Sequence, residues 1–147
     1  MLDGLSNTAF VSERLIAGPL GTDIRRDPLL LPPTFPESVT PACVAMNRTS
    51  PGSSRTSIWA PLGTRWLSGV LSQSVYYHFL PPNCAWRDCD PEDGAGFALV
   101  SARSAHFGGV HVAFGDGACR RISSQVDLAT WRAFATRSGG DAITRFE

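Results

Sequence analysis

The segment from residue 104 to residue 141 constrains the fold more than any other part of this chain. Apolar residues occupy every second position of residues 110–114 (VHVAF), the two-residue period that is typical of a half-buried strand. Asp116-Gly117 comes next, a favoured pair for a two-residue type I′ turn, in which both central residues have positive φ. Residues 118–123 then supply the partner strand, so the sequence predicts a β-hairpin.

A helix is predicted directly after this hairpin. Asp127 is a good N-cap residue, and Val126 before it and Trp131 four residues later predict a hydrophobic staple. We expect Gly139-Gly140 to end the helix. An apolar stripe recurs at three-residue spacing, formed by Leu128, Trp131 and Phe134.

The first two thirds of the chain are rich in residues that interrupt regular structure. Most of the eleven prolines and fourteen glycines lie before residue 100, and residues 18–63 are predicted to be loop-rich. Shorter elements are expected at residues 8–15 (a strand or the end of a short helix), 75–80 (a strand) and 97–101 (a strand). We therefore expect a single α+β domain over 1–147, with an antiparallel sheet, long irregular loops, and 97–141 as its best-defined part.

Composition excludes some classes of function. The formal net charge is zero, so no electrostatic term favours nucleic acid. No apolar run approaches the roughly 20 residues of a membrane helix, and we expect no membrane insertion by this chain itself. The sequence also opens without a signal peptide, as though it began inside a domain: we consider a C-terminal fragment, a misplaced gene start and a domain that stands alone.

The four cysteines suit either disulfides in an exported protein or buried thiols in a cytosolic one. Four residues separate Cys84 from Cys89, and we predict a small-loop disulfide between these two. Cys119 is the expected free thiol, and Cys43 is the fourth cysteine of the chain. The spacing does not match a pair of CxxC zinc ligands.

His106, His111 and Asp116 lie within eleven residues of one another and suggest a transition-metal site. The two histidines are five positions apart in the sequence, so on one extended strand they would face opposite sides of the sheet. Asp116 is explained by its turn. The favoured interpretation is a structural histidine whose hydrogen bond crosses the loop that Gly108-Gly109 tightens.

A second candidate site is an acidic loop. Its carboxylates suit calcium, but Gly94 falls one place late for an EF-hand and Leu99 stands where a glutamate is needed. An acidic surface loop is the favoured interpretation, calcium is the one cofactor considered, and no other is expected. The candidate ligands are Asp88, Asp90, Glu92 and Asp93.

Catalysis finds little support in the motifs. No serine lies in a GxSxG element, and the chain has neither a P-loop nor a GxGxxG loop. We expect no enzyme activity, with a calcium- or disulfide-stabilised hydrolase as an alternative. The four tryptophans offer a second alternative, a secreted module that recognises carbohydrate or another polymer, with Trp86 as its test residue.

His106 is followed by nine residues and then by Asp116-Gly117, and Trp131 lies in the helix that follows. In this order the chain resembles the prepilin-like family named for its H-x9-DG element, a planctomycete-type domain of unknown function. The elements that match lie along nearly the whole chain: 3–8 (DGLSNT), Arg65-Trp66 with Gly69, 80–84 (LPPNC), His106, Gly108-Gly109, 110–114, Asp116-Gly117, 121–123 (RIS), 130–132 (TWR) and 136–141 (TRSGGD).

The resemblance implies the C-terminal globular part of a type II secretion or type IV pilin-like subunit, without the family's N-terminal leader and long apolar helix. It implies a structural or binding role, a periplasmic, extracellular or cell-surface location, and other pseudopilin-like subunits or secretion components as partners. The motif residues, which it implies are structural, are His106, Gly108, Gly109, Asp116, Gly117 and Trp131.

Overall fold

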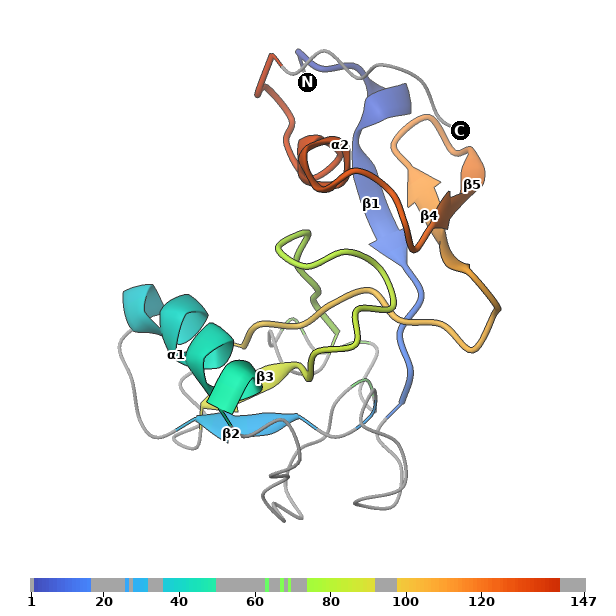
Figure 1. The fold of residues 1–147 in the computed structure, drawn as a ribbon. Helices are drawn as coiled ribbons and strands as arrows, with labels where there is room; N and C mark the ends of the chain where they lie inside the picture. The colour runs from blue at the N-terminus through green and yellow to red at the C-terminus, as the bar shows by residue number, and fades with distance from the viewer. Residues whose placement is uncertain are drawn as a thin grey trace. The chain divides into compact units, whose positions relative to one another are not determined.

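The computed structural model describes residues 2–16, 26, 28–31, 36–49, 63, 67, 69, 74–91 and 98–140. The chain forms two compact units, which are described separately. Unit 1 comprises Met1–Arg14, Tyr77–Cys84 and Ser101–Glu147, and unit 2 comprises Leu15–Tyr76 and Ala85–Val100. Strands and helices occur in both units, which confirms the α+β class (Figure 1).

The sheet of unit 1 has three antiparallel strands in the order β1-β4-β5. These are β1 (Ala9–Ser12), β4 (Gly109–Phe114) and β5 (Cys119–Ser123), with a 3₁₀ helix, η1 (Leu5–Asn7), before β1. The alternation in residues 110–114 does place a buried face on β4, where Val110, Val112 and Phe114 are almost inaccessible to solvent. The predicted hairpin and the strand near the N-terminus are thus confirmed (Figure 1).

The turn of this hairpin differs from the prediction. Phe114 accepts a hydrogen bond from the Gly117 amide and donates one to the Ala118 carbonyl, so the loop has three residues rather than two. Gly117 has φ +84°, whereas Asp116 does not have a positive φ. The Asp116 carboxylate accepts from the Ala118 amide at 2.9 Å, which stabilises this three-residue loop and explains why the type I′ turn is wrong.

Helix α2 (Leu128–Ala133) begins as predicted and ends early. Asp127 is its N-cap and accepts a hydrogen bond from the Thr130 amide at 2.9 Å. The chain leaves the helix at Phe134, so the expected end at Gly139-Gly140 is wrong. Thr136 and both glycines donate instead to the carboxylate of Asp3, and the amides of Gly140 and Gly139 lower the pKa of that carboxyl.

Trp131 is the centre of the core of unit 1. Its side chain is fully buried, and its indole nitrogen donates to the Leu80 carbonyl at 2.8 Å. The ring of His78 stacks on it at 3.8 Å between centroids, and His78 Nδ1 lies 2.6 Å from the Trp131 carbonyl oxygen. The segment 75–80 forms turns and a bend but no strand, so the strand predicted there is wrong.

Unit 2 contains a parallel pair, β2 (Leu29–Leu31) and β3 (Cys89–Pro91), and a 14-residue helix, α1 (Pro36–Thr49). This helix corrects the prediction of loops throughout 18–63. Pro36 stands at the first helical position, where a missing amide costs nothing, and only Pro41 lies inside the helix. The strand expected at 97–101 is reduced to a single antiparallel bridge between Leu99 and Cys89.

The disulfide of unit 2 joins Cys43 on α1 to Cys89 on β3, so the predicted bond between Cys84 and Cys89 is wrong. Cys43 lies four residues from both Val39 and Asn47, and these three side chains form the buried face of the helix. Helix packing, which sequence spacing does not report, therefore brings Cys43 to Cys89. Cys84 and Cys119 take no part in a disulfide, as predicted for Cys119, and Cys119 is exposed.

Among the described residues, no helix combines the length and the apolar character that crossing a membrane requires.

Two glycines of unit 1 should respond differently to alanine. A Cβ on Gly117 meets nothing but forces an L-residue to φ +84°, so Gly117→Ala should cost about 1–2 kcal/mol and Gly117→Asn less. A Cβ on Gly109 would clash with the backbone carbonyl of Ile122, so Gly109→Ala should cost about 3 kcal/mol or more. Urea unfolding of the three variants measures this order, and equal losses at both positions would contradict it.

His78 should make unit 1 sensitive to acid. Burial lowers the pKa of His78 below its ordinary 6.5, against the opposing effect of the hydrogen bond to Trp131. Between the folded and unfolded pKa values the unfolded chain binds more protons, so the stabilisation is complete above about pH 6.5 and falls as the pH is lowered. Unfolding free energies between about pH 7 and pH 5 should decline more steeply for the parent protein than for His78→Gln; parallel curves would refute this assignment.

Candidate functional site

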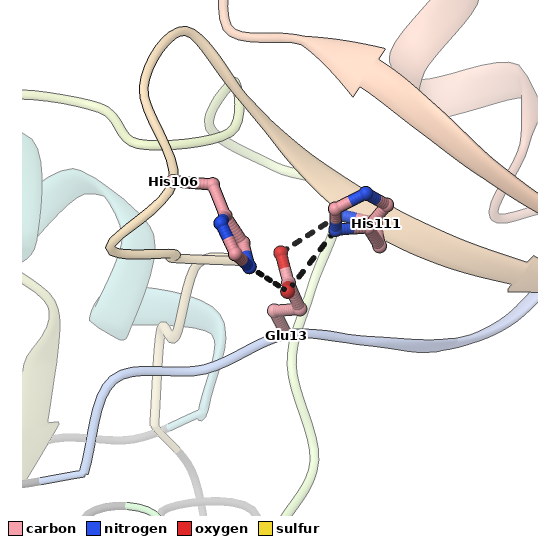
Figure 2. A group of neighbouring side chains, drawn as sticks. All are labelled: Glu13, His106 and His111. Atoms are coloured by element: carbon pink, nitrogen blue, oxygen red, sulfur yellow. Dashed lines mark hydrogen bonds and ion pairs between the residues drawn. The ribbon is translucent and has the colours of Figure 1, made fainter.

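One carboxylate and two imidazoles meet beside the first half of β4 in unit 1 (Figure 2). Glu13 follows β1, His106 lies in the loop before β4, and His111 lies within β4. Glu13 Oε1 lies 3.3 Å from His106 Nε2 and 3.2 Å from His111 Nδ1. One oxygen therefore faces both ring nitrogens.

The strand register explains why Glu13 meets His111. Ser12 pairs with Val112 in the antiparallel ladder, and extending that register by one residue places Glu13 opposite His111. The His111 amide donates to Glu13 Oε2 at 2.8 Å, which fixes the carboxylate beside the strand. Side-chain contact across the two strands follows from this pairing.

His106 reaches the same place because the chain reverses before β4. Gly108 has φ +76°, a conformation that L side chains rarely adopt, and Gly109 packs too closely on the Ile122 carbonyl to carry a side chain. His106 thus lies outside the strand, so the condition under which the two histidines would face opposite sides does not hold. Their rings meet edge to face with centroids 5.1 Å apart.

The Glu13 carboxylate is held in its charged form. Partial burial raises its pKa, but hydrogen bonds from the His111 amide, the Ser104 hydroxyl and the His111 ring outweigh burial and lower it. The Arg103 amide also donates to the Glu13 carbonyl at 3.0 Å, which anchors the backbone at this position. The site therefore presents a fixed negative charge to both imidazoles.

The cluster is open to solvent. The side chains of His106, His111 and Glu13 are 63%, 42% and 30% exposed. Two imidazoles and a carboxylate are groups that bind divalent transition metals, and an exposed face leaves access for a ligand.

The other predicted metal residue, Asp116, is used elsewhere. Its carboxylate accepts from the Ala118 amide and pairs with Arg120 at 3.0 Å, so it belongs to the hairpin loop. Gly117 and Trp131, the remaining family-motif residues, lie in the hairpin loop and the core.

The acidic candidates of unit 2 are partly described. Asp88 is buried rather than exposed, and Asp90 is half-buried in β3, which does not fit an open acidic loop at these two positions. Glu92 and Asp93 lie outside the described residues. Trp86 is half-buried, while Trp59 and Trp66 fall outside the described residues.

Glu13 is the residue that the sequence alone did not reveal. It lies 98 residues before His111, and no local motif connects the two. The available signal was indirect: Glu13 lies within the element predicted at residues 8–15, and only the pairing of the strands places it opposite His111.

A sequence model of a family described as a protein of unknown function, DUF1559 (SBP_bac_10), matches residues 1–129. No curated protein and no solved structure matches this chain.

Replacing Glu13 should expose the His111 amide to exchange. Glu13→Ala removes the oxygen to which this amide donates, and loss of a hydrogen bond to a charged group should accelerate its hydrogen exchange about tenfold or more. Asp116→Ala is the matched control, because it should affect the Ala118 amide and leave His111 unchanged. Equal protection of His111 in the parent and in Glu13→Ala would contradict the geometry.

Proposed function

This chain belongs to the DUF1559 family of proteins of unknown function, and we propose that it is a pilin-like globular domain that acts outside the cytoplasm without catalysis. In this role it contributes structural or binding contacts to a secretion- or pilus-like assembly. The proposal joins the family membership to the resemblance carried by His106 and Asp116-Gly117.

The main support is the use to which the motif residues are put. Gly108 and Gly109 shape the loop before β4, and Asp116-Gly117 forms the hairpin loop. Trp131 fills the core. Residues that recur in a motif because they build a scaffold favour a structural domain over an enzyme whose motif would supply reacting groups.

The disulfide supports the location. Cys43 and Cys89 are 1% and 0% exposed, so the bond lies inside unit 2. Structural disulfides form and persist in oxidising compartments and are rare in the cytosol. A buried disulfide of this kind favours the periplasm or the cell surface.

The surface of β1 supports contact with other subunits. β1 is an edge strand of the three-stranded sheet, and Val11 on it is 63% exposed. Phe10 on the same strand and Leu5 in the preceding helix η1 are also about half exposed. Exposed apolar residues on the outer strand of a sheet are a common basis for protein contact.

A photo-cross-linking residue at position 11 tests the role in cells that produce the whole protein. Adducts with pilin-like subunits are expected in the envelope fraction, because position 11 lies on the exposed edge strand. Position 107 is the control, since Phe107 is 97% exposed but lies in the loop before β4.

Two results would reject the proposal. One is the absence of subunit adducts from position 11. The other is recovery of the protein in the cytosol with the thiols of Cys43 and Cys89 reduced.

A further inference from the structure

We propose that Glu13, His106 and His111 form a zinc site with three protein ligands and one open coordination position. The ligand atoms are Glu13 Oε1, His106 Nε2 and His111 Nδ1, and they lie within 4.8 Å of one another. The inference is independent of any role in a filament.

The spacing of these atoms matches the size of a zinc ion. Tetrahedral zinc with bonds of about 2.0–2.1 Å separates its ligand atoms by about 3.3 Å. The carboxylate oxygen already lies 3.3 Å from one ring nitrogen and 3.2 Å from the other. Only the two imidazoles need to approach each other, a movement that the exposed loop carrying His106 permits.

The orientation of the carboxylate leaves one oxygen for the metal. Oε2 accepts the His111 amide at 2.8 Å, and the Ser104 hydroxyl also donates to this carboxylate. Such outer contacts fix the direction of a ligating carboxylate and preserve its charge. Oε1 then faces both imidazole nitrogens (Figure 2).

Zinc binding displaces the protons from the two ligating ring nitrogens. In the metal-free protein a ring N–H of each histidine can point at Oε1; in the zinc complex the same nitrogens present lone pairs, and the protons move to the opposite ring nitrogens or to solvent. In the zinc complex His106 would carry its proton on Nδ1 and His111 would carry its proton on Nε2. The fourth position is then filled by water from the exposed side.

The ligand set favours zinc over calcium. Calcium takes six to eight oxygen ligands, whereas this cluster offers two nitrogens and one carboxylate, the set that suits zinc and related transition metals. The three ligands come from two strand regions and the loop between Ser104 and Gly109, so the bound ion would fasten β1 to β4 and its preceding loop.

Isothermal titration of the chelator-treated protein with zinc chloride at neutral pH tests the proposal. One ion should bind per chain, and Glu13→Gln, His106→Asn and His111→Asn should each weaken binding about 100-fold, at least as much as loss of an outer-shell partner. Asp116→Asn is the matched control on the same hairpin and should bind as the parent does. Cobalt(II) should give the intense visible absorption of a tetrahedral nitrogen and oxygen site, and His106→Asn should abolish it.

The alternative is a hydrogen-bonded Glu–His–His cluster without a metal. Failure of the parent protein to bind zinc, or binding that survives in the double variant of His106 and His111, would overturn the proposal. Binding of copper(II) or nickel(II) without zinc would overturn the assignment of the metal. Far-ultraviolet circular dichroism must match the parent for each variant, and Glu13→Gln, which keeps the size of the side chain, gives the decisive result where a histidine variant unfolds.

Discussion

Trp131 is the residue on which unit 1 depends. Its indole N–H donates a hydrogen bond to the Leu80 carbonyl. The ring of His78 stacks on the indole and contacts the Trp131 backbone carbonyl through Nδ1. The segment around Leu80 has no strand or helix of its own, so this anchor determines its path and thereby positions Asn83. Asn83 then donates to the Gly109 carbonyl and accepts from the Ser104 amide, on both sides of the loop that carries His106. The core thus positions the cluster through these hydrogen bonds and the short backbone segment that joins Leu80 to Asn83.

Local chemistry in the sequence was sufficient for the hairpin strands and for the start of α2. Period-two alternation predicted β4, and Asp127 caps its helix as its residue type favours. The failures are cases in which a distant partner decides. The segment 75–80 has the composition of a strand but forms turns, and its Leu80 carbonyl accepts a hydrogen bond from Trp131. Cys89 pairs with Cys43 on a helix, and Glu13 becomes a site residue only through strand pairing. The turn was missed for a local reason, because Asp-Gly suits both two- and three-residue loops and the Asp116 side chain selects the longer one.

The interval of nine residues between His106 and Asp116 acquires a physical meaning from the fold. β4 occupies Gly109–Phe114 between them, so the interval is one strand with a short loop at each end. The histidine marks where the chain enters the sheet and the Asp-Gly pair marks where it turns back. A motif of this kind preserves the length of a strand, while the loop at its first end carries a side chain that is free to meet Glu13.

The disulfide has a consequence for the order in which the chain assembles. Pairing β1 with β4 closes a loop of 98 residues between Glu13 and His111, and the link from Cys43 to Cys89 lies inside that loop and spans 46 of them. Oxidation therefore roughly halves the effective loop, and each halving lowers the entropic cost of closure by about 0.6 kcal/mol. A chain in which Cys43 and Cys89 are already joined would pair its first strand more readily, so formation of the disulfide also favours completion of a sheet that contains neither of these two cysteines.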